Sequence, residues 1–155
     1  MVDEVSALNT AVKMIQEGIR PPVVYAATGL AKQKLRQMYQ EIHGKPAIRG
    51  RVPETAHRRL KSFMAVMDAT LFFRIYKDLA GHKLFRVMDS NLMIDAYRLY
   101  KESVAVHRID ATTAWFLARD LGEKTIEIRR CRLCNNEYLY DKRSDYMQTC
   151  LLCRT

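Results

Sequence analysis

Four cysteines constrain the fold of this chain more than any other feature, because all of them lie within its last 25 residues. They form two Cys-x2-Cys pairs, Cys131 with Cys134 and Cys150 with Cys153, and 15 residues separate the pairs. Two thiolates three residues apart on a tight turn can reach one ion at about 2.3 Å, and a second such pair completes a tetrahedron. The spacing therefore predicts one structural Zn²⁺ held by four cysteines.

Other uses of these cysteines are weaker hypotheses. Disulfide bonds need an oxidising compartment, which nothing in the sequence indicates, and thioredoxin-type redox chemistry needs one Cys-x-x-Cys motif rather than a matched pair. Four protein ligands leave no coordination position for an activated water, so we expect a structural metal and not a catalytic one. Alternating polar and apolar residues at 125–129 and, less regularly, at 137–140 predict two short strands of a zinc-ribbon-like hairpin.

The chain before this hairpin has the periodicity of helices. We predict a mainly α fold with a multi-helix domain at 1–122, which contains a helix-turn-helix-like segment at 23–43, and a small zinc-binding module at 123–155. The helices that we expect lie at about 5–18, 23–27, 31–43, 54–79, 90–103 and 110–122.

Apolar residues at helical spacing predict the buried faces of these helices. The expected stripe of the first helix is Val5, Leu8, Val12, Ile15 and Ile19. That of the 54–79 helix is Leu60, Phe63, Met64, Met67, Leu71 and Phe72. That of the 90–103 helix is Leu92, Met93, Ala96, Leu99 and Tyr100. Ser90 and Asp110 are the expected N-caps of the last two helices.

Positive charge is concentrated in one part of the chain. The sequence has 26 Lys and Arg against 17 Asp and Glu, a formal net charge of +9, and residues 31–62 carry +7 of it. A polyanion is therefore an expected partner. The alternative is that the basic residues only keep helix faces in contact with water, but such residues would be spread more evenly.

The basic window overlaps the predicted helix-turn-helix. Thr28, Gly29 and Leu30 form the turn, where glycine adopts a positive φ without strain. If the following helix enters a major groove, its early residues reach bases and phosphates, and glutamine can bond adenine through two hydrogen bonds. The expected DNA-binding residues are Lys32, Gln33, Lys34 and Arg36 in this helix and Lys45, Arg49 and Arg51 in the loop after it. A helix, a glycine turn and a basic helix also occur in proteins that do not bind DNA.

A second basic group surrounds the cysteines. A Zn²⁺ ion with four thiolates carries a net charge of −2, which nearby cations can offset. Binding to nucleic acid is an equally good interpretation of these residues. They are Arg129, Arg130, Arg132, Lys142, Arg143 and Arg154.

With these residues in view, the chain resembles the FlhC family of bacterial flagellar transcriptional activators over nearly its whole length. The Ala96–Tyr100 segment, Ala-Tyr-Arg-Leu-Tyr, and the cysteine spacing are the most specific features. Supporting features are Thr28-Gly29-Leu30, Leu35, Met38–Ile42, Gly44, the loop to Pro53 and Thr113-Ala114-Trp115.

The resemblance implies a cytoplasmic transcriptional activator that works as a hetero-oligomer with FlhD, binds promoter DNA of flagellar operons and assists RNA polymerase. It also implies that Cys131, Cys134, Cys150 and Cys153 bind zinc. Family members usually continue past the last cysteine, whereas this sequence ends two residues after Cys153. We therefore expect that any role of that tail is absent or that the sequence is truncated.

The sequence also bears on two other classes of function, a protein-interaction adaptor and an enzyme. A zinc-containing protein-interaction adaptor without direct DNA readout is the main alternative, because the first helix and the Met- and Phe-rich helices could dock a partner. An enzyme is not expected, since His43, His57, His82 and His107 are scattered and no nucleophile or acid lies at motif spacing. A membrane span is not expected either, because no run of about 18 uncharged apolar residues occurs.

Overall fold

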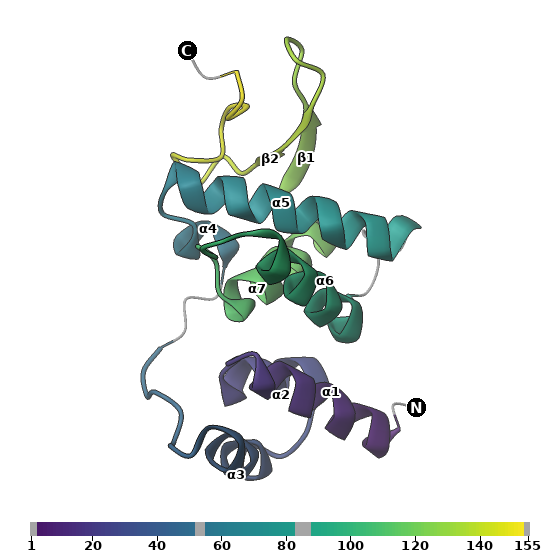
Figure 1. The fold of residues 1–155 in the computed structure, drawn as a ribbon, viewed down its shortest axis with the longest axis vertical. Helices are drawn as coiled ribbons and strands as arrows, with labels where there is room; N and C mark the ends of the chain where they lie inside the picture. Colours follow the sequence, from purple (N-terminus) through teal and green to yellow (C-terminus); the bar gives the residue numbers. More distant parts are fainter. Residues whose placement is uncertain (1–2, 52–54, 83–87, 154–155) are drawn as a thin grey trace. The chain divides into compact units, whose positions relative to one another are not determined.

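The computed structural model describes residues 3–51, 55–82 and 88–153. Over these ranges the chain forms seven helices, α1 to α7, and one antiparallel two-stranded sheet (Figure 1). The predicted mainly α fold with a C-terminal cysteine cluster is confirmed. Among the described helices, none has a stretch both long and apolar enough to cross a bilayer.

Packing divides the chain into two compact units, Met1–Val52 and Pro53–Thr155. The division lies within the basic window, so cations that are close in sequence belong to different units. The predicted division into a helical domain at 1–122 and a zinc-binding module at 123–155 stays a prediction.

The first unit contains three helices, α1 (Glu4–Gln16), α2 (Pro21–Thr28) and α3 (Lys32–His43). Proline stands at the start of α2, where its missing N–H costs nothing. Gly29 and Gly44 end α2 and α3 at φ values of 73° and 72°, which favour glycine. The core of this unit consists of Ala7, Ala11, Met14, Ile15, Ile19, Val23, Val24 and Leu35.

The buried face of α1 differs from the predicted stripe. Val5 is 61% exposed and Leu8 and Val12 are only half-buried, whereas Ala7 and Ala11 are buried. Small alanine side chains let α1 pack closely against α2 and α3, and this turns the larger residues of its first half toward the edge of the contact. The stripe was therefore right only for its last two residues, Ile15 and Ile19.

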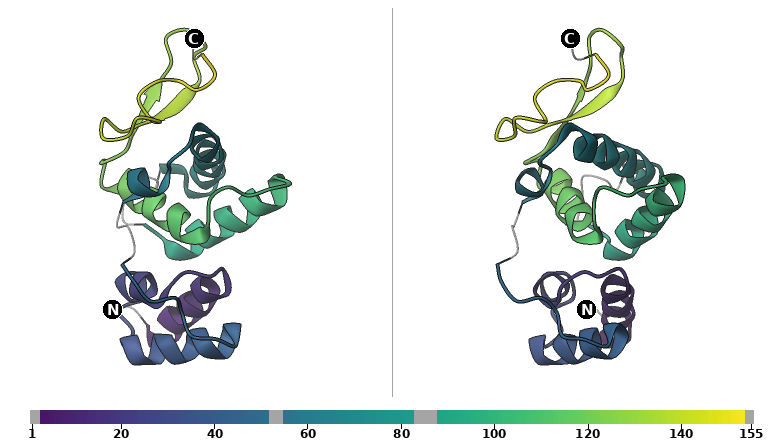
Figure 2. Two further views of the ribbon diagram at one scale, coloured as in Figure 1. Left: turned by 90° about the vertical axis from the view of Figure 1, so that its left-hand side faces the viewer. Right: turned by 60° about the vertical axis from the view of Figure 1, so that its left-hand side comes forward.

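The second unit contains α4 (Ala56–Arg59), α5 (Phe63–Ala80), α6 (Ser90–Ser103) and α7 (Ala111–Gly122). Strands β1 (Glu127–Arg130) and β2 (Glu137–Tyr140) follow, with Ile128 opposite Leu139. Helix α5 lies between this hairpin on one side and α6 and α7 on the other (Figures 1 and 2). The core of this unit is made of aromatic and aliphatic side chains. They include Phe72, Phe73 and Tyr76 of α5, Tyr100 of α6 and Leu117 of α7.

The predicted continuous helix at 54–79 is wrong. The chain leaves the helical conformation at Leu60, and a new helix starts after Ser62, whose hydroxyl accepts a hydrogen bond from the N–H of Ala65 at 3.1 Å. This N-cap stabilises a helix start that the apolar periodicity alone does not reveal. Residue 54, the expected first residue, lies outside the described residues.

The new start also changes which face of α5 is buried. Met64 and Met67 are 48% and 45% exposed, because the buried residues Val66, Phe73 and Tyr76 turn the other side of the helix into the core. In α6, Leu99 is likewise 44% exposed.

The N-caps of α6 and α7 were predicted with unequal success. Asp89 and not Ser90 caps α6, because its carboxylate accepts hydrogen bonds from the N–H groups of Asn91 and Leu92. The predicted cap of α7 is confirmed, since Asp110 accepts from the N–H of Thr113 at 2.8 Å.

Candidate metal centre and nucleic-acid interface

The four cysteines converge on one point at the end of the β1–β2 hairpin. Their Sγ atoms all lie within 4.8 Å of one another, and the Sγ atoms of Cys134 and Cys150 are 3.7 Å apart. A tetrahedral ion with metal–sulfur bonds of about 2.3 Å needs sulfur atoms about 3.8 Å apart. The cluster therefore has the donors and the spacing to bind one metal ion.

The first cysteine pair is placed by a tight turn between the strands. The N–H of Cys131 donates to the carbonyl of Asn136 at 2.8 Å, and the N–H of Asn135 donates to the carbonyl of Cys131 at 2.9 Å. Asn135 has a φ of 62°, a conformation that asparagine tolerates better than most residues. The N–H of Leu133 points at the Cys131 sulfur at 3.4 Å, as in turns that stabilise a thiolate.

Hydrogen bonds and burial shift the pKa values of Cys134 and Cys153 in opposite directions. Backbone and side-chain hydrogen bonds from Asn136 lower the pKa of Cys134 to about 6. The pKa of Cys153 rises to about 12, first through its hydrogen bond to Cys134 and then through burial. Cys134 thus ionises more readily than Cys153, and binding of a cation would release the protons that remain on the sulfur ligands.

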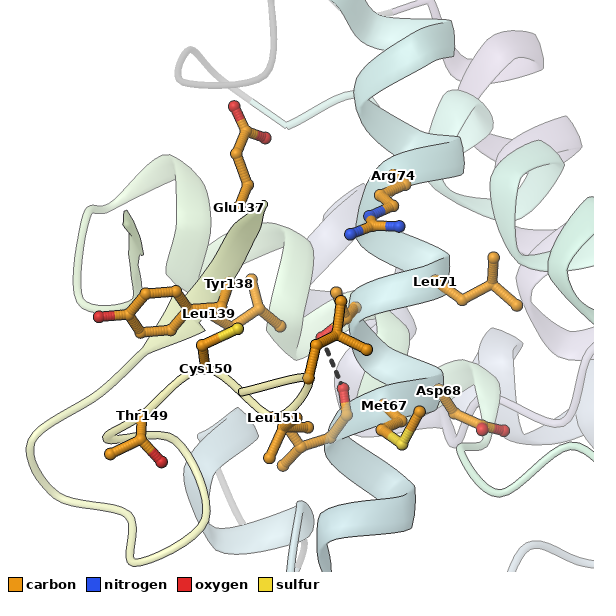
Figure 3. Close-up of a pocket in the computed structure, with 13 residues that line it drawn as sticks. Met67, Asp68, Leu71, Arg74, Glu137, Tyr138, Leu139, Thr149, Cys150 and Leu151 are labelled. Atoms are coloured by element: carbon orange, nitrogen blue, oxygen red, sulfur yellow. Dashed lines mark hydrogen bonds between the residues drawn. The ribbon is translucent and has the colours of Figure 1, made fainter. Parts of the chain in front are cut away.

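The cysteine-bearing segment is attached to α5. Lys77 on α5 donates to Glu137 of β2 at 2.9 Å, and the rings of Phe63 and Tyr146 meet edge to face at 5.0 Å. A pocket of about 270 Å³ remains between the helix and the segment. Figure 3 shows Cys150 and Leu151 beside the α5 face that carries Met67. Met67, one of the two exposed methionines of α5 named above, therefore lines this pocket.

A buried carboxylate ties α4 and α7 to the start of the hairpin. Asp120 accepts the N–H of Ala56 at 2.9 Å through its side chain, and its carbonyl accepts the N–H groups of Thr125 and Ile126. Its side chain is only 2% exposed and is paired with Arg119 at 3.0 Å.

Most of the described cations around the cysteines have partners inside the module. Arg129 pairs with Glu127 at 3.0 Å and lies over the Tyr140 ring, with its guanidinium carbon 3.4 Å from the ring centroid. Arg130 pairs with Glu137 at 3.4 Å, and Arg143 pairs with Asp141 at 2.6 Å. These contacts favour a structural role for the three arginines. Arg154 lies outside the described residues.

The structure exposes all seven residues that were predicted to bind DNA, both those of α3 and those of the loop after it. In α3 Leu35 is buried and Met38, Tyr39 and His43 are half-buried, so one face packs on the unit and the rest of the helix is open to solvent. Lys34 lies 3.9 Å from the carboxylate of Glu4, and the Nζ of Lys32 lies 4.9 Å from the centre of the Tyr25 ring. The exposed residues are Lys32, Gln33, Lys34, Arg36, Lys45, Arg49 and Arg51.

Two residues that sequence reasoning missed hold this surface in place. Arg20 donates from one guanidinium nitrogen to the carbonyls of Ile48 and Gly50, at 2.6 and 2.7 Å, and so fixes the loop on either side of Arg49. The Nε2 of His43 lies 2.6 Å from the carbonyl of Ile15 and joins the end of α3 to α1. An arginine just before a Pro-Pro pair gives no signal of such a long-range contact.

Comparison with known proteins places the chain in one family. A family model described as "Flagellar transcriptional activator (FlhC)" matches residues 1–155. The chain belongs to this family. Its members are described as transcriptional activators, which are not a class of enzyme. The resemblance stated from the motifs is thus confirmed.

Curated relatives of the FlhC family agree along most of the chain. The flagellar transcriptional regulator FlhC of Paraburkholderia atlantica is 27% identical over 143 residues, which cover 90% of this chain and 65% of that protein. The chain therefore spans less than two thirds of that relative. The proteins of the same name from Variovorax paradoxus and Erwinia tasmaniensis are 24% and 29% identical, over 99% and 86% of this chain and 77% and 76% of their own lengths.

Proposed function

We propose that this chain is the DNA-binding subunit of a flagellar transcription activator, which works in the cytoplasm as a hetero-oligomer with an FlhD-type partner at flagellar operon promoters. The observation that carries this proposal is α3, a basic helix that follows a glycine turn and exposes Lys32, Lys34 and Arg36. Membership of the FlhC family supports the choice of flagellar promoters.

One face of helix α3 packs on the first unit, and the opposite face is exposed to solvent. Leu35 anchors it in the core of the first unit, and His43 fixes its end to α1. The exposed first half then offers Lys32, Lys34 and Arg36 to phosphates, with Gln33 available for a base edge. A major groove is wide enough to admit an α-helix, so α3 is the element that we assign to it.

The loop after α3 extends the same charged surface. Arg20 holds the backbone at Ile48 and Gly50, so the exposed Arg49 stands on a fixed segment. Lys45 and Arg51 are exposed on the same loop. Cations on a fixed backbone lose less conformational entropy when they bind phosphate, which favours this loop as a backbone clamp beside the groove.

The metal that we propose for the four cysteines is one structural Zn²⁺. Thiolates are soft ligands that select zinc among the common divalent ions, and four of them close the coordination shell. The ion would tie the turn after β1 to the segment that contains Cys150, and it offers no position for catalysis.

Exposed apolar side chains of the first unit support a role in assembly as well. Val5, Tyr25 and Ile42 are 61%, 42% and 38% exposed. A partner subunit of the FlhD type, and RNA polymerase at the promoter, are the partners that we propose. An adaptor that docks proteins without reading DNA is the second candidate function, and these same residues favour it.

The test is a triple variant, Lys32→Ala with Lys34→Ala and Arg36→Ala, assayed by gel shift on a flagellar promoter fragment with and without FlhD. We expect DNA affinity to fall at least about tenfold, because three phosphate contacts are lost. The control removes two exposed cations of the second unit that belong to neither basic group, Arg74 and Lys124. Unchanged binding by the α3 variant, with FlhD still bound, would instead favour the adaptor.

A further inference from the structure

The second unit has a cationic hollow of its own. It measures about 540 Å³ and is lined by Arg58, Arg59 and Lys61 from α4 and the residues after it, and by His107 and Arg108 from the loop before α7. The first three residues belong to the basic window of the sequence, whose other cations lie on the first unit. The fold thus divides one run of positive charge between its two units.

The loop wall of the hollow is held by the two tyrosines of the Ala96–Tyr100 segment. The Tyr97 hydroxyl donates to the carbonyl of Ile109 at 3.0 Å. The Tyr100 hydroxyl donates to the buried carboxylate of Asp68, which also accepts the N–H of Arg108 at 3.0 Å. The Arg108 N–H also lies 3.1 Å from the Tyr100 hydroxyl oxygen, so hydrogen bonds to α5 and α6 fix the backbone at Arg108 and Ile109.

The α4 wall is fixed by Arg59. Its Nε donates to the Thr113 hydroxyl and its Nη2 to the Asp110 carboxylate, both at 2.9 Å. The other oxygen of Asp110 accepts the N–H and the hydroxyl of Thr113, at 2.8 and 2.7 Å. Among the described residues Asp110 is the one carboxylate that lines the hollow, and both of its oxygens accept hydrogen bonds from Arg59 or Thr113, although its side chain is 62% exposed.

The remaining cations of the hollow are available to a ligand. Arg58 and Lys61 are exposed, and neither side chain forms a hydrogen bond or ion pair with any residue that the structure describes. Arg108 is 43% exposed and keeps only a long contact, 3.7 Å, with Asp68. The 12-residue helix α7 begins at this place, and its N-terminal dipole adds to the positive potential.

We propose that this hollow binds phosphate groups of double-stranded DNA and is a second contact surface, distinct from α3. A free nucleotide fits less well, because within the described ranges the lining offers no aromatic ring for base stacking except the His107 imidazole. Cations spread over two walls of an open, polar hollow match successive phosphates of a backbone. The identity of the ligand as DNA rests on the proposed function.

The test removes the two unpaired cations together, Arg58→Ala with Lys61→Ala, in the full chain with FlhD. Binding to a short mixed-sequence DNA duplex is measured by fluorescence anisotropy over a range of salt concentrations. Each lost contact lowers the slope of log affinity against log salt by about 0.9, so the slope should become shallower by about 2. With equal affinities at 1 M salt as the reference, the variant should bind the duplex about 30-fold more weakly than the wild type at 0.15 M salt.

The control is Arg74→Ala with Lys124→Ala, which removes two exposed cations of the same unit outside the hollow and should leave the slope unchanged. Wild-type affinity and slope in the Arg58/Lys61 variant would overturn the second surface while the first stands. Absence of DNA binding by the wild type would instead overturn the proposed function.

A second measurement identifies the source of the phosphate. Amide signals of His107 and Arg108 are followed by NMR during titration with the duplex and, separately, with inorganic phosphate. Shifts that saturate with the duplex support the proposal. Shifts with inorganic phosphate alone would make the hollow a small-anion site and overturn its role in DNA binding.

Discussion

Removal of one hydroxyl, by Tyr100→Phe, should destabilise the second unit measurably. Tyr100 is completely buried, and its hydroxyl donates to Asp68 and accepts the N–H of Arg108 at 3.1 Å. Phenylalanine keeps the ring, so no cavity forms, and the Arg108 N–H keeps its bond to Asp68. The loss is then one hydrogen bond to a buried charged group, which lowers the free energy of unfolding by about 1.5–3 kcal/mol.

The same variant should change the alkaline end of the stability profile. Burial, followed by the hydrogen bond to Asp68, raises the pKa of Tyr100 to about 12. Because the folded pKa exceeds the ordinary value of about 10, the wild type has its full advantage below pH 10 and loses it as pH rises toward 12. The difference between wild type and Tyr100→Phe should therefore shrink above pH 10.

Urea unfolding followed by circular dichroism measures both effects. Tyr138→Phe is the matched control, because the Tyr138 hydroxyl has no hydrogen bond among the described residues and its loss should cost little. A Tyr100→Phe protein whose unfolding free energy lies within about 0.5 kcal/mol of the wild type would refute the role given to this network.

Three further predictions concern the metal, the turn and acid. Removal of the metal by a chelator should expose the four cysteines to a thiol reagent while the helical circular dichroism signal is largely kept; unreactive cysteines would contradict metal binding. Gly29→Ala should cost about 1–2 kcal/mol in urea unfolding, because residue 29 has a φ of 73°, and an unchanged midpoint would argue against that turn. Burial and then Arg143 lower the pKa of His57, so stability should fall as pH drops below about 6.5, and His57→Gln should lose less over the same range.

The cysteine pairs and the helix ends at Gly29, Gly44 and Asp110 were predictable because their signals are local. A Cys-x2-Cys pair, a glycine at a positive φ and an Asp N-cap each act within three or four residues of the chain. The strand pair and the turn at Gly29 followed from such patterns. Long-range packing decided the rest, as in α1, where Ala7 and Ala11 and not Val5 face the core.

The division of the basic window shows why the candidate DNA surfaces could be predicted only in part. In the sequence, residues 31–62 form one charged region. The break at Leu60–Ser62 and the contacts of Arg59 with Asp110 and Thr113 assign its last cations to the second unit. No local pattern reports a contact over more than 50 residues, so the hollow could not be predicted.

The salt dependence of binding to a flagellar promoter fragment tests the central claim most directly. With metal-loaded chain and FlhD, residues 31–62 should neutralise about five phosphates, so log affinity should fall against log salt with a slope near −4 to −5. An affinity that does not change with salt would contradict the claim that the cations of this chain hold the DNA backbone.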